Sequence, residues 1–157
     1  MDANPLSLVL LCALALLLVS AAVEDLRIRE IANWKNAAIA LMAPLWWWSA
    51  GLDPWPGMAI QFGVAAIVFA VFIGAFAIGQ MGGGDVKLIG ALSLWLAPMR
   101  LLDMLLVMAV AGGVLTLAFL VDRRVRRSTD PVEVPYGVAI AIAGLLSLGE
   151  PLLNQFA

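Results

Sequence analysis

Long apolar runs recur along this chain, and they constrain its fold more than any other feature. Residues 6–23, 58–78 and 101–121 are each mostly apolar, and a helix needs about 20 such residues to cross a bilayer. A soluble domain of 157 residues, 64% of them hydrophobic, has too little interior to bury so much apolar surface. The chain is therefore predicted to be an integral membrane protein, with lipid as the apolar solvent.

Shorter apolar runs bring the number of expected helices to six. The predicted fold is all-α, a polytopic membrane helix bundle that forms one domain over residues 1–157. The fourth helix is too short by itself and is expected to extend in both directions. The six expected segments are 6–23, 37–52, 58–78, 86–96, 101–121 and 136–153.

Basic residues predict the orientation of this bundle, because Lys and Arg favour the cytoplasmic side. All nine basic residues except Arg100 fall in the first, third and fifth loops. These loops are therefore expected to face the cytoplasm, with both termini outside. The tryptophans Trp46, Trp47 and Trp48 would then anchor the chain at the outer interface, where indole rings are favoured.

Composition excludes several classes of function. The chain has no histidine, which rules out a Ser-His-Asp triad, a Cys-His pair and an HExxH zinc site. The single cysteine, Cys12, excludes an internal disulfide and a CxxC metal site. The net charge of −2 argues against nucleic-acid binding. No metal or cofactor is expected, so any catalysis must use carboxylates, lysine, serine or backbone groups.

Two aspartates are the candidate reactive groups. Asp85 follows the glycines Gly82–Gly84, which allow close backbone approach and unusual dihedral angles. A hinge that ends in an N-cap aspartate explains this segment equally simply. Asp25 ends the first expected helix, and a carboxylate paired with Arg27 or Arg29 at the interface explains it when it is taken alone.

The two aspartates are more informative as a pair, because the first and third loops are expected on the same face of the membrane. Two neighbouring carboxyl groups do not both ionise easily and can share one proton. One of them can then act as general base on water while the other protonates a scissile carbonyl oxygen. Asp25 and Asp85 are therefore predicted to form the catalytic dyad of a peptidase.

At these residues the sequence resembles the type IV prepilin peptidases, which are membrane aspartyl proteases with a Gly-x-Gly-Asp motif. The segment 82–88 is similar to the family's second-aspartate motif, 25–33 to its first-aspartate motif and 134–139 to its Pro-Tyr start of the last helix. The resemblance implies that Asp25 and Asp85 are catalytic. It also implies a set of substrate-binding or supporting residues, namely Gly82, Gly83, Gly84, Lys87, Asn33, Pro135 and Tyr136.

Several of these supporting roles stay open. Lys87 either pairs with a carboxylate or marks the cytoplasmic side, and Asn33 is expected to form or support a turn. Pro135 suits a helix start, and Tyr136 is as well explained by anchoring at the interface as by a role in the site. Ala32 stands where the family usually has proline, so the turn after the first helix is expected to be less rigid.

The resemblance also implies a substrate and a location. The chain is similar to the short class that serves Flp-type (tight adherence) pili, because it lacks the Cys-rich cytosolic region of the long members, which also methylate the pilin. It is expected to sit in the bacterial inner membrane, in contact with lipid. There it would cut the leader peptide from a prepilin at the cytoplasmic boundary of the pilin's hydrophobic segment.

Three other functions are compatible with the pattern. A Gly-x-Gly-Asp protease of other substrates would cut within the membrane, but the charged run after Asp25 favours a site at the boundary. A subunit of a proton-coupled transporter would use paired acids, but no acid lies at the centre of an apolar run. An inactive assembly factor would tolerate loss of Asp85.

Overall fold

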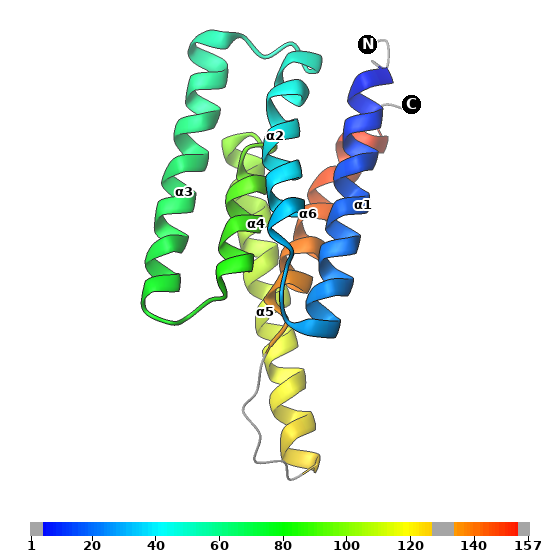
Figure 1. Ribbon diagram of the computed structural model, residues 1–157, viewed down its shortest axis with the longest axis vertical. Coiled ribbons are helices and arrows are strands. Elements are labelled where there is room, and N and C mark those ends of the chain that lie inside the picture. The colour runs from blue at the N-terminus through cyan, green and yellow to red at the C-terminus, as the bar shows by residue number, and fades with distance from the viewer. Residues whose placement is uncertain (1–4, 127–133, 154–157) are drawn as a thin grey trace.

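A computed structural model describes residues 5–126 and 134–153 of the chain. The described residues form six α-helices that run roughly side by side, which confirms the predicted all-α bundle (Figure 1). Three segments are long and apolar enough to cross a membrane: Pro5–Ile28, Pro54–Ala77 and Pro98–Val125. The helices are α1 (Pro5–Ile28), α2 (Asn33–Ser49), α3 (Ala59–Ala77), α4 (Gly83–Ser93), α5 (Pro98–Arg126) and α6 (Tyr136–Leu153).

The outer surface of the bundle is apolar, as lipid contact requires. Of the residues of α3, only Gln61 and Ala65 are buried, while Phe62 and Ile67 are 62% and 66% exposed. Large apolar side chains are similarly exposed on α1 and α5. A soluble monomer rarely exposes such continuous apolar surface, so this surface identifies lipid as the surrounding medium.

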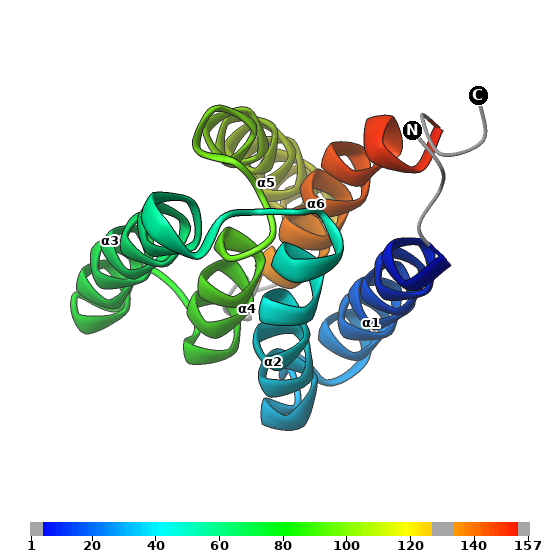
Figure 2. The ribbon, with the colours of Figure 1, turned by 90° about the horizontal axis from the view of Figure 1, so that it is seen from above.

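The shortest helix, α4, lies at the centre of the bundle. It packs against α2, α3 and α6, and Figure 2 shows it between α2 and α3. It begins three residues before the expected start at residue 86, which confirms the expected extension at this end, but it ends at Ser93, so the expected extension beyond residue 96 was wrong. The helix ends in two turns of the 3₁₀ type, in which Leu94 N–H donates to Ala91 O and Trp95 N–H donates to Leu92 O. Pro98, which cannot continue a helix, then begins α5.

Side chains of neighbouring helices satisfy the last carbonyls of this short helix. The Trp47 Nε1–H donates to Leu94 O at 2.7 Å. The Gln61 amide donates to Ser93 O at 2.9 Å and also to Leu96 O. A helix leaves its last four carbonyls without internal partners, and lipid offers none. Because Trp47 is only 8% exposed, the expectation that it anchors the interface was wrong, whereas Trp48 is 80% exposed.

The helix boundaries differ from expectation mainly at the basic end of the bundle. α1 continues to Ile28, so only residues 29–32 connect it to α2, and the expected long connection over 24–36 was wrong. The expected loop at 122–134 is partly helical, because α5 continues to Arg126. α2 begins four residues earlier than expected and ends before Gly51, whose positive φ of 69° stops the helix.

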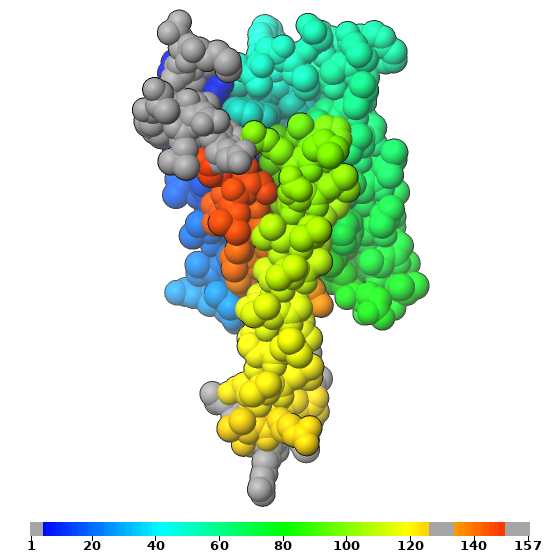
Figure 3. Space-filling view, turned by 180° about the vertical axis from the view of Figure 1, so that it is seen from behind, coloured from blue at the N-terminus to red at the C-terminus, as the bar shows by residue number. Residues whose placement is uncertain are grey.

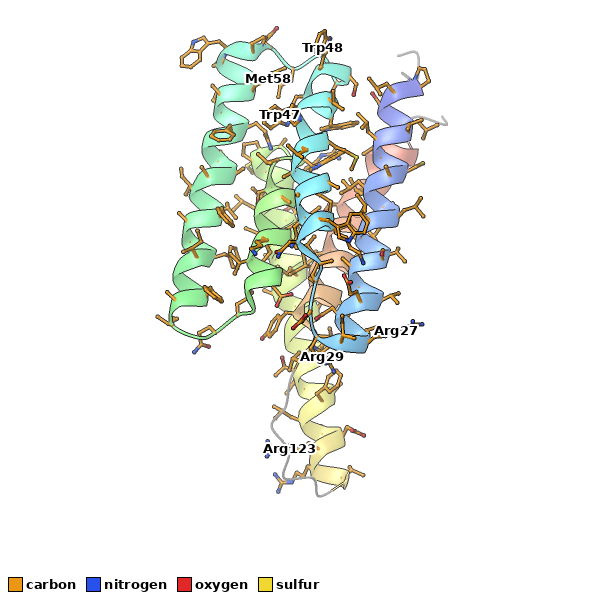
Figure 4. All side chains as sticks on the ribbon, viewed as in Figure 1. Arg27, Arg29, Trp47, Trp48, Met58 and Arg123 are labelled. Atoms are coloured by element: carbon orange, nitrogen blue, oxygen red, sulfur yellow. The ribbon has the colours of Figure 1, made fainter. Side chains whose placement is uncertain are left out.

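The two ends of the bundle carry different side chains, in agreement with the expected arrangement of the loops. Arg27, Arg29 and Arg123 lie toward one end, and Trp47, Trp48 and Met58 lie at the other (Figure 4). α1 begins and α6 ends at the tryptophan end (Figure 1). On the opposite face, α5 runs beside α6 and extends beyond the other helices at the arginine end (Figure 3).

This arrangement predicts the accessibility of the two ends in spheroplasts. In a Cys12→Ser background, single substitutions Asp53→Cys and Arg124→Cys place one thiol at each end, because both residues are exposed. A membrane-impermeant maleimide should label the first variant in intact spheroplasts and the second only after permeabilisation. Labelling of both from outside would contradict the bundle, and the reverse order would contradict the orientation.

Candidate active site

Asp25 lies in the last turn of α1, which continues to Ile28 instead of ending at Asp25 as predicted. Its side chain is buried, with 5% of its surface exposed. The backbone N–H of Val138, in the first turn of α6, donates to Asp25 Oδ2 at 3.3 Å. The free N–H groups at a helix N-terminus are natural partners for an anion. The start of α6 therefore orients a carboxylate that lies 113 residues earlier in the chain.

A glycine in α6 makes this approach possible. A Cβ atom at Gly137 would lie 2.8 Å from Asp25 Oδ2 and 2.8 Å from Ile31 Cδ1, which is closer than real Cβ atoms approach other heavy atoms. Gly137 was not among the predicted site residues. Its position two residues after Pro135 gave no signal by itself, because its role depends on a contact with α1.

Asp85 enters the same region from α4. It is the third residue of that helix and is half-buried, and the helix begins after Gly82. A Cβ at Gly82 would lie 3.0 Å from Asp85 Oδ2, so the carboxylate turns back over the residue that precedes the helix. Ile31 lies against Gly137, which Asp25 also approaches, and against Gly84, the residue before Asp85. The structure thus brings together the two predicted aspartates, from α1 and α4.

The glycines before Asp85 are less loop-like than expected. Gly83 and Gly84 belong to the first turn of α4, and only Gly82 precedes it. A Cβ at Gly84 would lie 3.3 Å from the Ile31 Cβ and 3.4 Å from the Ile31 backbone nitrogen. The start of α4 therefore packs closely against the turn that follows α1.

Two side chains from the first turn of α2 hold the start of α4. Lys87 Nζ donates to Asn33 Oδ1 at 2.7 Å, which joins two of the predicted supporting residues. Asn36 Nδ2 donates to Gly84 O at 3.3 Å. Because the lysine binds an amide, the structure does not show the expected pairing with a carboxylate, and the expectation that Lys87 marks the cytoplasmic side stays a prediction. Asn33, the first residue of α2, accepts the hydrogen bond from Lys87, and its supporting role in the site stays a prediction.

The turn between α1 and α2 is held by Glu24 rather than by a proline. The Ala32 backbone N–H donates to Glu24 Oε2 at 3.0 Å, and Lys35 Nζ lies 2.9 Å from the same oxygen. Lys35 Nζ also donates to Ser20 O at 3.1 Å. Ala32 has a φ of −58°, which is the value a proline ring would impose. The expected loss of rigidity at this position is thus offset by a hydrogen bond that proline could not make.

Arg29 closes the end of α1 in an uncommon conformation. Its φ of 57° is left-handed, a region that residues other than glycine rarely adopt. Its backbone N–H donates to Asp25 O at 3.0 Å, and its guanidinium lies 5.3 Å from the centre of the Phe119 ring. The arginine thereby connects the end of α1 to α5, four residues after the buried Asp25.

The last predicted pair begins α6. Pro135 is fully buried and immediately precedes the helix, as expected. The Tyr136 ring packs against α5, where a Cβ at Gly112 would lie 3.0 Å from the Tyr136 Cε1. These contacts fix the start of α6, and hence the N–H groups that face Asp25. They give Tyr136 a packing role between two helices.

The contact at Gly137 predicts a specific loss of stability. Gly137→Ala should destabilise the fold by on the order of 1–3 kcal/mol, because both crowded groups are buried. Gly149→Ala is the matched control in the same helix, since nothing lies within 4 Å of its would-be Cβ. The melting temperature in detergent should fall for the first variant and stay equal or rise for the second. Equal melting temperatures would show that Asp25 does not need this glycine.

The Glu24 hydrogen bond predicts non-additive effects. Glu24→Ala should lower the melting temperature in the wild-type background. In an Ala32→Pro background the same change should lower it less, because the N–H that Glu24 accepts is already gone. Melting temperatures of the two single variants and the double variant measure the difference. Strictly additive effects would mean that this hydrogen bond does not stabilise the turn.

Comparison with known proteins agrees with the predicted resemblance. Residues 12–117 match the Type IV leader peptidase family. A relative in Legionella pneumophila, "Prepilin leader peptidase/N-methyltransferase", is 30% identical over 78 residues, which is 48% of this chain and 26% of that protein. The chain thus spans about a quarter of the relative's length. No solved structure matches. Because the family match covers more than half of the chain, this membrane protein belongs to the type IV leader peptidase family.

Proposed function

We propose that the chain is an aspartyl endopeptidase that removes the leader peptide from a Flp-type prepilin at the cytoplasmic boundary of the inner membrane. Membership of the leader peptidase family supports a protease with a prepilin-like substrate. The similar Legionella pneumophila protein is named a prepilin leader peptidase. The short-class resemblance supports the Flp pilin as substrate.

The meeting of Asp25 and Asp85 is the observation that carries the proposal. Their helices are connected through α2 and α3, yet Ile31 lies both against Gly137, which Asp25 also approaches, and against Gly84, the residue before Asp85. Asp25 lies in the last turn of α1, two residues before Arg27, and the start of α4, which carries Asp85, lies at the same end of the bundle (Figure 1). Burying two acids together is costly, and hydrolysis of a peptide bond is a function that uses such a pair.

In the proposed mechanism the two carboxyl groups share one proton around a bound water. The ionised carboxylate takes a proton from this water as its oxygen attacks the scissile carbonyl carbon. The protonated carboxyl gives its proton to the carbonyl oxygen, so a neutral tetrahedral intermediate forms. The intermediate collapses as the C–N bond breaks and the proton taken from water passes to the leaving amine. The other carboxylate takes back one hydroxyl proton, so the product is a carboxylic acid and the pair again shares one proton. The Val138 N–H keeps Asp25 oriented through both steps.

Substitution of either aspartate should abolish this reaction. Asp25→Asn and Asp85→Asn should each lower the turnover of a co-expressed Flp prepilin by at least about 10²-fold, because each acid has a separate part in the transition state. Asp103→Asn, at an exposed acid on α5, should cleave at the wild-type rate. The mass of the pilin reports the cleavage.

The same experiment tests the alternatives. Cleavage by Asp85→Asn would exclude the dyad, and pilus assembly that survives in this variant without cleavage would indicate an assembly role. If the wild-type chain leaves the prepilin intact but cuts other membrane helices, the substrate in this proposal is wrong.

The start of α4 predicts a second kinetic effect. Gly84→Ala should lower turnover more than it lowers the melting temperature, because the added methyl meets the Ile31 backbone and moves the helix that carries Asp85. It should also be more damaging than alanine at Gly82 or Gly83. Gly63→Ala is the control in α3, where nothing lies within 4 Å. If the alanine variants at Gly82, Gly83 and Gly84 all cleave normally, these glycines serve only as a structural hinge.

A further inference from the structure

A groove of about 510 Å³ lies between α2 and α3, with α4 as its floor. Each helix, with the residue that caps α4, contributes four lining residues, and the last three lie three, four and seven positions after the first. They are Asn33, Asn36, Ala37 and Ala40 on α2, Phe62, Ala65, Ala66 and Phe69 on α3, and Lys87, Gly90, Ala91 and the cap residue Leu94 on α4. Seven residues of helix span about 10 Å, so the groove runs for two turns along the bundle.

The small residues of this groove let another chain approach closely. Ala37 and Ala66 are exposed, although most exposed positions on these helices carry large apolar side chains. Small residues at a membrane interface allow neighbouring backbones to come near one another. Because α3 packs mainly on α4, the groove faces lipid between α2 and α3, which gives a membrane-embedded segment lateral access.

One end of the groove is polar, and this end lies beside the start of α4, the helix that carries Asp85. Asn36 is only 5% exposed. Its Nδ2 donates to Gly84 O, the carbonyl just before Asp85. Its Oδ1 is buried and accepts no hydrogen bond from the described residues. A buried acceptor without a partner is costly. Asn36 also lines the groove, so a bound chain that reaches its side chain can supply the missing donor.

This acceptor distinguishes between possible occupants. An acyl chain of a lipid would fill the apolar part but offers no donor to Asn36 Oδ1. A regular transmembrane helix would also offer none, because its N–H groups are used internally. A peptide segment that is apolar at one end and locally unwound at the other supplies both an apolar surface and free backbone N–H groups. Cleavage requires the same unwinding at the scissile bond.

We propose that this groove binds the first two turns of the substrate's hydrophobic segment, with the backbone next to the scissile bond donating a hydrogen bond to Asn36 Oδ1. The inference rests on the proposed function and adds the place where the substrate binds. The apolar part of the segment lies over Ala66 and Phe62. Its N-terminal end, unwound, lies beside Asn36, Lys87 and the start of α4. The scissile bond is thereby delivered to Asp85.

Filling the groove should weaken binding without changing the chemical step. Ala37→Phe and Ala66→Phe each place a ring in the groove from an exposed position, so the fold should be retained and its melting temperature should stay near that of the wild type. The KM for a prepilin in detergent should rise at least about tenfold, with kcat nearly unchanged. Ala70→Phe, at an exposed residue of α3 outside the groove, is the control and should match the wild type. An unchanged KM in both groove variants would overturn the proposal.

Crosslinking identifies the occupant without turnover. p-Benzoylphenylalanine in place of Phe62 or Phe69, in an Asp85→Asn background, should give an adduct with prepilin upon illumination. The control position is Ile67, which is exposed on α3 and does not line the groove. Adducts with lipid alone, adducts with a second copy of the chain alone, or equal prepilin adducts at the control position would each overturn the proposal. Cleavage by the wild type together with any of these results would leave the proposed peptidase function intact.

Discussion

Lipid accepts apolar side chains but offers no hydrogen bonds to a backbone, and the whole structure depends on this constraint. Because of it, every described element of regular structure is helical. The unpaired N–H and C=O groups at each helix end within the bundle also need hydrogen-bond partners from the protein. α4 shows the consequence most clearly. The helix is too short to cross a bilayer, and its final carbonyls accept hydrogen bonds from Trp47 and Gln61 on the two neighbouring helices.

At the opposite end of α4 the same constraint applies to unpaired N–H groups. There the free groups belong to helix starts, which favour negative charge. Asp85 lies in the first turn of α4, and Asp25 lies at the first turn of α6. One end of the short helix is thus closed by amide and indole donors, while the other holds the two acids. The position of α4 at the centre of the bundle places these acids among protein groups rather than lipid.

Much of this arrangement could be predicted from the sequence, because apolar runs, basic loops and the two aspartate motifs are local signals. The six helices followed from apolar length, and the common face of Asp25 and Asp85 followed from basic residues. The remaining features depend on contacts across the bundle. α1 continues past Glu24 and Asp25 because both carboxylates find donors, at Ala32 and Val138. No local pattern predicts such partners. For the same reason, neither the role of Gly137 nor the burial of Trp47 could be predicted from the sequence.

The turn after α1 shows how one backbone geometry can be reached in two ways. A proline ring would hold residue 32 covalently, whereas here the carboxylate of Glu24 holds its N–H, and Lys35 holds the carboxylate. The two solutions exclude each other, because a proline nitrogen has no hydrogen to donate. Positions 24 and 32 should therefore vary together among related chains. An acid at position 24 should accompany alanine at position 32, and chains with proline there should be free to lose that acid.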